Sequence, residues 1–167
     1  MNDKLNALFD EMTAYFSGDP KRIQHFTKVH AYARLIGIRE GLSADKLFML
    51  EAAAMVHDIG IKPAERLYGY NNGKLQEELG PPEARKMLDN LGFEPAMTNR
   101  ICAAVSRHHT YHDINDVILQ ILIEADFLVN LYEDSSARGA VVNAYRKVFA
   151  TASGKALMEK MYAIQPE

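Results

Sequence analysis

Six side chains in this sequence are of the types that bind a divalent metal ion, and they stand where helix surfaces or helix ends can converge. They are His25, His57, Asp58, His108, His109 and Asp126. Neutral imidazoles and carboxylates bind Mn, Fe, Ni, Co, Zn and Mg to differing degrees, so they do not identify the metal. Because the set contains no thiolate, a structural zinc site is not expected. We predict a site for one divalent metal ion, with enough candidate ligands for a second.

The adjacent pair His57 and Asp58 closes an alanine-rich run that ends at Gly60. Helical spacing places His57 on one stripe with the apolar residues Leu47, Leu50 and Ala54. A buried polar group without a partner costs about 1–3 kcal/mol, and a lone buried carboxylate costs more. A metal ion would satisfy both side chains. Gly60 supports the end of this helix, since glycine accepts the turn and lets a loop or ligand approach closely.

Asp126 interrupts a segment, residues 117–131, that is apolar nearly all round and is therefore predicted to be the central helix of the core. A carboxylate in such a helix is rarely left uncompensated, so a cation, an arginine or a hydrogen-bond network must meet it. Glu124, two residues earlier, points to the other side of the helix.

A further predicted helix carries two histidines, His25 and His30, that point in different directions. The face of His25 continues at intervals of four, four and three residues with Val29, Ala33 and Ile36. We therefore expect His25 to be the inward ligand. His30 lies on a neighbouring stripe, where it is a satisfied core histidine, a surface residue or the true ligand in a shifted register.

These residues and their local contexts resemble the HD domain superfamily, a group of all-helical, metal-dependent phosphohydrolases named for an adjacent His-Asp pair. The resemblance rests on His25 with Val29 and Ala33, on the run Ala52-Ala-Ala-Met-Val-His-Asp-Ile-Gly60, and on Glu124-Ala-Asp126. It covers roughly residues 20 to 130. The His-Asp pair alone is a weak signal, but four ligand positions in the right order make the resemblance specific.

Carried over position by position, the resemblance implies that the first metal is held by His25, His57, Asp58 and Asp126. His108 and His109 match the tandem histidines that bimetallic members, such as the HD-GYP phosphodiesterases, use for a second metal. Gln76 stands where many bimetallic members have a further histidine, which is a departure from the pattern. The candidates for a second metal or a phosphate are thus His108, His109 and Gln76. No Gly-Tyr-Pro triplet follows the histidine pair, so the resemblance does not extend to the usual cyclic-dinucleotide enzymes.

The chain reads as helical almost throughout, with no convincing strand alternation. We predict an all-α fold, a single helical bundle of the HD type with about seven or eight helices over residues 1–167. Its family-like core covers about residues 20–130, and two C-terminal helices lie within residues 135–163. A length of 167 residues suits one domain that buries roughly two-thirds of its unfolded surface.

Several helix limits are predicted from capping and helix-breaking residues. A first amphipathic helix is expected at about residues 3–16, and Asp19-Pro20 and Ser43 start the next two helices. Pro81-Pro82 and Pro95 are expected to start two further helices, and the helix from Pro95 should reach the histidine pair. Asp113 or Asn115 is expected to cap the central helix. Ser153-Gly154 should separate the last two helices.

Residues 61–80 read as one long irregular stretch, and loops of this length in compact domains are usually functional or disordered. Because the stretch starts at the His-Asp pair, we expect it to border the metal. In the functional interpretation it is a lid in which Tyr68 or Tyr70 stacks on a base or sugar. Lys62 or Lys74 then meets a phosphate. In the simpler interpretation, the tyrosines cover apolar surface and the lysines are solvated.

The histidine pair and its neighbours also have alternative interpretations. Adjacent residues on a helix point about 100° apart, so one of His108 and His109 can be a ligand while the other faces solvent or core. Arg107 binds a phosphate through two nitrogens or forms a surface salt bridge. Cys102 is most simply a buried apolar residue.

Composition limits the partners. The net charge of −3, from 19 basic and 22 acidic residues, does not indicate binding to duplex nucleic acid. A single cysteine cannot form an internal disulfide, and the first residues lack the layout of a signal peptide. No segment is apolar for long enough to span a bilayer. We expect a cytoplasmic protein with a small phosphorylated substrate and no membrane partner; the sequence does not determine the oligomeric state.

The expected activity is hydrolysis of a phosphate monoester or diester in a nucleotide or another small phosphorylated metabolite, by a water that the metal activates. Asp58 is the expected helper in activating water, and His108 or His109 the expected donor of a proton to the leaving oxygen. Two alternatives remain open. One is a di-iron oxygenase of the same superfamily. The six potential ligands permit it, and Gln76 in place of a histidine argues against it. The other is a non-catalytic module that binds a metal and a nucleotide.

Overall fold

The computed structural model describes residues 2–165. Nine α-helices follow one another within this part of the chain, and it contains no strand, so the predicted all-α class is confirmed. They are α1 (Asn2–Tyr15), α2 (Pro20–Arg39), α3 (Ala44–Val56), α4 (Ile61–Tyr68), α5 (Gly73–Asn90), α6 (Pro95–Val105), α7 (Val117–Glu133), α8 (Arg138–Lys147) and α9 (Ala152–Tyr162). The predicted domain of residues 1–167 includes residues 1, 166 and 167, which lie outside the described part.

Capping side chains start α2 and α3 where the sequence predicts. The Asp19 carboxylate accepts a hydrogen bond from the backbone N–H of Arg22 at 3.2 Å, and Pro20 occupies the first helical position, where its missing N–H costs nothing. The Ser43 hydroxyl accepts from the backbone N–H of Lys46 at 3.4 Å. These two helix starts are therefore determined locally. They fix the direction in which each later side chain of the same helix points.

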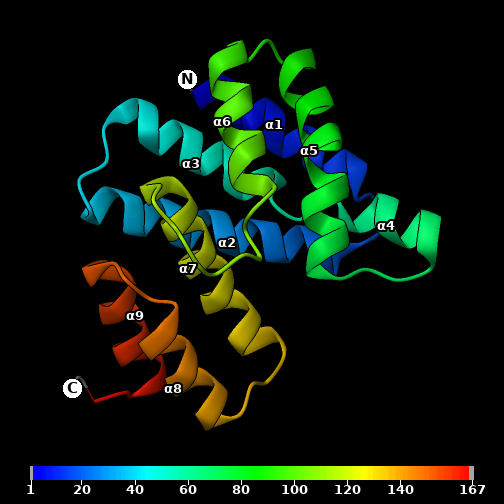
Figure 1. Ribbon diagram of the computed structural model, residues 1–167. Helices are drawn as coiled ribbons and strands as arrows, with labels where there is room; N and C mark the ends of the chain where they lie inside the picture. Colours follow the sequence, from blue (N-terminus) through cyan, green and yellow to red (C-terminus); the bar gives the residue numbers. More distant parts are fainter. Residues whose placement is uncertain (1, 166–167) are drawn as a thin grey trace.

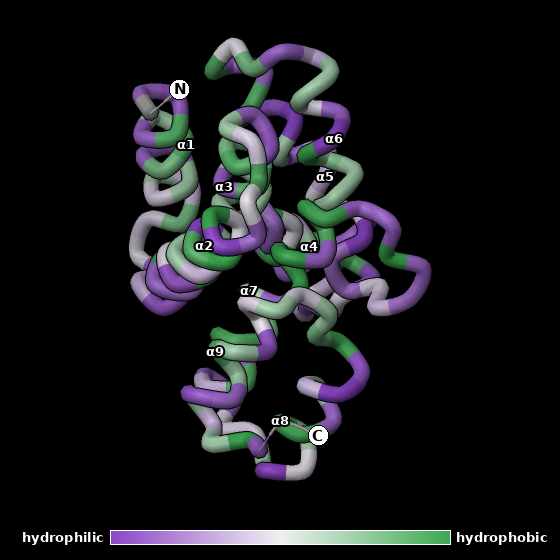
Figure 2. Tube along the Cα trace, turned by 90° about the vertical axis from the view of Figure 1, so that its left-hand side faces the viewer, coloured by the Kyte–Doolittle hydropathy of each residue, from purple (hydrophilic) through white to green (hydrophobic). Residues whose placement is uncertain are grey.

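The helices are arranged around α2, which packs against α3 and α7. Figure 1 shows α1, α3, α5 and α6 on one side of α2 and the pair α8 and α9 on the other, with α7 reaching from one group to the other. Colouring by hydropathy shows apolar and polar residues alternating along the tubes of α1 and α2, as expected for helices that cover a core (Figure 2). In α7, by contrast, eleven of the residues are buried, so it is the central helix that the sequence predicts.

The segment 61–80, predicted as one irregular loop, is instead mostly helical. It consists of α4, a short connection, and the first two turns of α5, which accounts for the ninth helix. Pro81 and Pro82 therefore lie inside α5 and do not open it. Gly80 explains part of this tolerance, because the proline ring clashes with the backbone N–H and the Cβ of the residue before it, and glycine has no Cβ.

Three other limits also differ from those predicted. The cap of α7 is Asp116, whose carboxylate accepts from the backbone N–H of Ile118 at 2.7 Å, and not Asp113 or Asn115. α6 ends at Val105, so the histidine pair lies in the turn that follows. The last two helices are separated at residues 148–151, and Ser153-Gly154 belongs to the first turn of α9.

Among residues 2–165, no helix combines the length and apolar character that a membrane span requires.

Gly60 brings the backbone after the His-Asp pair into direct contact with α5. Its φ of −68° is ordinary, so the predicted need for an unusual turn is not the reason for glycine here. A Cβ at Gly60 would lie 2.7 Å from the carbonyl oxygen of Gln76 and 2.8 Å from the backbone nitrogen of Gly80. Both atoms belong to the backbone of α5, which cannot shift without distorting the helix. Glycine is therefore required because the two backbones lie so close together.

We expect Gly60→Ala to lower the free energy of unfolding by about 1–3 kcal/mol, the usual cost of overpacking a core. Gly139→Ala is the matched control, because a Cβ there meets no atom within 4 Å, and it should be neutral or stabilising by up to about 1 kcal/mol. Denaturant unfolding measures both variants. Equal effects at the two positions would contradict the close contact at Gly60.

Candidate metal centre

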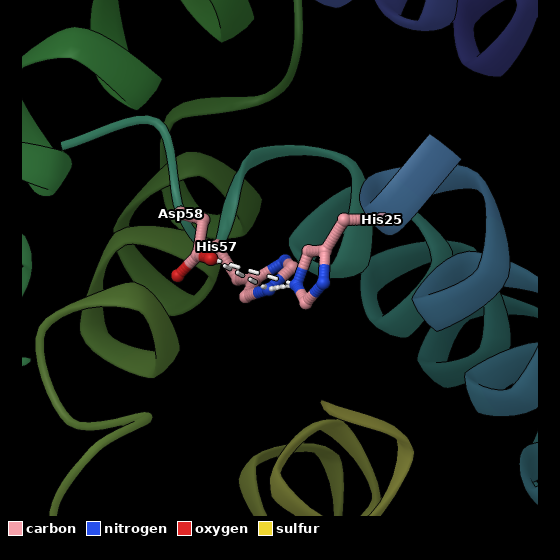
Figure 3. A group of neighbouring side chains, drawn as sticks. All are labelled: His25, His57 and Asp58. Carbon is pink, nitrogen blue, oxygen red and sulfur yellow. Dashed lines mark hydrogen bonds and ion pairs between the residues drawn. The ribbon is translucent and has the colours of Figure 1, made fainter. Parts of the chain in front are cut away.

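Three helices bring the four residues of the predicted first metal site together. His25 comes from α2, His57 and Asp58 from the end of α3, and Asp126 from the middle of α7. His25 Nε2 lies 3.2 Å from His57 Nε2 and 3.2 Å from Asp126 Oδ1. Figure 3 shows the imidazoles of His25 and His57 turned toward each other, with the Asp58 carboxylate beside them.

Asp58 joins this group to the tandem histidines. Its Oδ2 lies 3.5 Å from His25 Nε2 and 3.7 Å from His57 Nε2, while its Oδ1 lies 3.0 Å from His108 Nε2 and 3.8 Å from His109 Nε2. Two overlapping groups of ligand-type atoms result, one with His25 and His57 and one with His108 and His109, and Asp58 belongs to both. The six residues singled out in the sequence thus form one cluster.

Hydrogen bonding decides which nitrogen each imidazole presents to the centre. His57 Nδ1 donates to the carbonyl of Ala54 at 2.9 Å, and His108 Nδ1 donates to the carbonyl of Val105 at 2.7 Å. A donated proton on Nδ1 leaves a lone pair on Nε2 in the neutral ring. This arrangement, with the outer nitrogen held by an acceptor and the inner one free, is typical of histidines that bind metals.

The outer nitrogen of the third imidazole is also held by a hydrogen bond, but the acceptor is a side chain. His25 Nδ1 donates to Glu133 Oε2 at 2.9 Å, so His25 Nε2 also faces the centre. Lone pairs and carboxylate oxygens at 3.2–3.7 Å repel one another unless a proton or a cation lies between them. This spacing is also that of neighbouring ligands around an ion bound at about 2.0–2.2 Å. The residues present therefore fit a divalent metal.

Burial strengthens the attraction of this centre for positive charge. Asp126 is 2% exposed and His57 is fully buried. Burial opposes the charged form of His25, but the hydrogen bond to Asp126 and the charges of Asp58 and Asp126 outweigh it and raise the pKa of His25 to about 9. Burial likewise favours the neutral form of Asp126, yet hydrogen bonds from His25 and His57 hold its pKa well below the usual range.

Gln76, a predicted candidate for a second metal or a phosphate, lies beside the second group through His109. Gln76 Oε1 lies 2.6 Å from His109 Nε2, and Gln76 Nε2 donates to Asn71 Oδ1 at 3.0 Å. Glu77, which the sequence reasoning did not single out, accepts from the backbone N–H of His109 at 3.0 Å. Burial and the charge of Asp126 raise the pKa of Tyr111 to about 12, and its hydroxyl lies 3.2 Å from His109 Nδ1.

Two further residues on α7 escaped the sequence reasoning. Asn130 Nδ2 donates to Asp126 Oδ1 at 2.9 Å, and Glu133 holds His25. Asp126, Asn130 and Glu133 stand at positions i, i+4 and i+7, which form one face of a helix. That spacing is the signal in the sequence that could have identified them.

His30 lies outside the cluster. Its Nε2 is 3.0 Å from Glu51 Oε1, which is also 3.3 Å from Nε of Arg34. Burial favours the neutral ring and lowers the pKa of His30, against the opposing charge of Glu51. Of the three alternatives left open by the sequence, the structure places His30 as a satisfied histidine.

A polar cavity of about 330 Å³ opens beside the cluster. Asp58, His25, His109 and Gln76 are among the residues that line it. Two helix N-termini border it, because Asp19, Lys21 and Arg22 stand at the start of α2, and Asn71 precedes the cap of α5. Side chains of Asp19 and Asn72 each accept one backbone N–H at these helix starts. The dipoles of the two helices favour an anion there.

The four predicted substrate contacts do not line this cavity. Lys62 donates to the carbonyl of Tyr15 at 2.5 Å and stands over its ring. Arg107 donates to the carbonyls of His112 and Asp113 and borders a separate cavity of about 140 Å³ between α3, α6 and α7. Lys74 and Tyr70 are exposed. The neighbouring Asn71 is the residue of this segment that reaches the cavity.

Comparison with known proteins agrees with the geometry. No curated protein matches the chain significantly. The crystal structure of a predicted HD superfamily hydrolase from an uncultured Thermotogales bacterium is similar, with 25% sequence identity and a TM-score of 0.65 over 98% of this chain and 85% of that one. The HD domain profile matches residues 22–139, which contain the whole cluster. The chain belongs to the HD domain family.

Proposed function

We propose that this protein is a metal-dependent phosphohydrolase that cleaves a phosphate monoester or diester of a nucleotide or another small phosphorylated metabolite. The observation that carries the proposal is the convergence of three imidazole lone pairs and two buried carboxylates at one end of a polar cavity. Helix N-termini at the same cavity favour an anionic substrate. The similar structure, of a predicted HD superfamily hydrolase, supports hydrolysis as the type of reaction.

In this proposal, His25, His57, Asp58 and Asp126 hold one divalent ion. When bound, such an ion lowers the pKa of a coordinated water and polarises a phosphoryl oxygen. The residues of the chain supply orientation and proton transfer. Because Asp58 reaches both groups of ligand atoms, its carboxylate is placed to accept a proton from the attacking water.

The two tandem histidines take different parts in this proposal. His108 is fully buried, and its Nδ1 is held by a backbone carbonyl, so its Nε2 is a candidate second-metal ligand. The side chain of His109 is 21% exposed and lines the cavity. His109 is therefore the one placed to donate a proton to the leaving oxygen or to contact a phosphate, with Gln76 orienting its ring.

The test is metal content followed by a screen for phosphate release. We expect protein purified without chelator to carry about one divalent ion per chain, and to release phosphate from nucleotides or phosphorylated metabolites with at least one of Mn²⁺, Co²⁺, Ni²⁺ or Mg²⁺. Chelator should abolish release, and the same ion should restore it. Metal binding with no turnover of any substrate would replace the hydrolase with a binding module, and two irons with oxygen uptake would indicate an oxygenase.

A further inference from the structure

We propose that Glu133 is a positioning residue that sets the affinity of the site for its metal by holding His25. The inference rests on the metal site of the proposed function, but not on the reaction. Glu133 lies one turn beyond Asn130 at the end of α7, and it is neither a candidate ligand nor part of the resemblance motifs.

The three inward-facing imidazoles differ in what holds their outer nitrogen. For His57 and His108 the acceptor is a backbone carbonyl of the residue three positions earlier, so the local turn itself orients the ring. His25 lies in the second turn of α2, where the backbone carbonyls are engaged in the helix. Its acceptor is instead the carboxylate of Glu133, 108 positions away in the sequence.

The carboxylate is itself held in place. Its Oε1 accepts from Lys28 Nζ at 2.5 Å, while its Oε2 accepts from His25. Lys28 and His25 are three residues apart on α2, so both donors belong to one face of the same helix. Lys28 Nζ also stands 5.8 Å from the centroid of the Tyr132 ring. With a separate donor on each oxygen, Glu133 has one orientation, and its side chain is only 14% exposed.

This geometry has two consequences for metal binding. A charged acceptor on Nδ1–H makes Nε2 a stronger electron donor than a neutral carbonyl would. It also orients the His25 ring, whose Nδ1 is bonded to Glu133 and not to a backbone carbonyl. Removal of such an outer partner typically weakens metal binding by about 10–100-fold. Of the three inward-facing imidazoles, His25 is thus the one whose affinity for the metal depends on a side chain, which a substitution can remove.

The experiment compares Glu133→Gln with Asp134→Asn in the full chain. Asp134 is the adjacent carboxylate, lines the same cavity and contacts none of the imidazoles, so its variant removes the same charge without touching His25. Affinity for Mn²⁺ and Co²⁺ alone is measured by calorimetry, and ¹⁵N NMR of the metal-free chain reports how fast the Nδ1 proton of the His25 ring exchanges with solvent. We expect Glu133→Gln to bind both ions about 10–100-fold more weakly and to exchange the Nδ1 proton of His25 faster, because the charged acceptor is gone. Asp134→Asn should stay within about threefold, since exposed charges are screened.

Equal weakening in the two variants would overturn the proposal, because net charge alone would then explain it. Unchanged affinity in Glu133→Gln would overturn it as well. If that variant does not fold, Glu133→Asp keeps the charge but shortens its reach, and the same loss of affinity and faster exchange of the His25 Nδ1 proton are expected. A wild-type chain that binds Mn²⁺ and releases no phosphate would remove the hydrolase function while leaving the role of Glu133 intact.

Discussion

Replacement of Asp126 with asparagine is expected to abolish metal binding and to reduce hydrolysis by at least about 10³-fold, with the helical content unchanged. Asp126 is the ligand-type carboxylate contributed by the central helix, and its Oδ1 lies 3.2 Å from His25 Nε2 and 3.5 Å from His57 Nε2. Asparagine has the same shape but no charge, so it cannot compensate a divalent ion in a buried site. Its amide N–H groups can instead donate to the two imidazole lone pairs, which keeps the metal-free chain folded.

Metal content per chain, phosphate release and far-ultraviolet circular dichroism measure the three parts of this prediction. Asp89→Asn is the control, because Asp89 is an exposed carboxylate on α5 and should keep wild-type metal content and activity. An Asp126→Asn protein that remains active without bound metal would remove the basis of the proposed function. Loss of helical content in this variant would mean that Asp126 is needed for folding and that its activity says nothing about the metal.

Glu124→Ala is expected to lower the free energy of unfolding by about 2–4 kcal/mol, the largest effect on stability that we predict. Glu124 is fully buried on the face of α7 opposite Asp126. Its Oε1 accepts from the backbone N–H groups of Ala150 and Thr151 at 2.8 and 2.9 Å, and its Oε2 accepts from the Thr151 hydroxyl at 2.5 Å. Alanine would leave these donors without a partner and open a cavity where α9 begins.

The position of Gly154 supports this account, because a Cβ there would overlap Glu124 Oε2. The start of α9 is therefore shaped around the carboxylate. Urea unfolding measures the effect, and Glu78→Ala, at an exposed position of α5, should change stability by no more than about 0.5 kcal/mol. A Glu124→Ala protein as stable as that control would show that α8 and α9 do not depend on this contact.

The sequence by itself determined the helical class and most of the cluster. Caps such as Asp19 and Ser43 are local, since a side chain satisfies an N–H only three residues away. Periodicity placed His25, and not His30, on the inner face, because side-chain direction in a helix follows from spacing alone. The His-Asp pair and Asp126 were recognised because a polar group on an apolar face needs a partner.

Only the tertiary structure decided what lies around that cluster. Glu133 meets His25 across 108 positions because α2 packs against α7, and no local rule pairs those two side chains. Gly80 and Pro81 remain in one helix because α5 rests on the backbone at Gly60, which overrides the local tendency of proline to end it. Lys62 and Arg107 do not line the cavity, because they donate instead to backbone carbonyls of Tyr15 and of His112 and Asp113. Periodicity determines the face on which a residue stands, whereas packing between distant segments determines what that face meets.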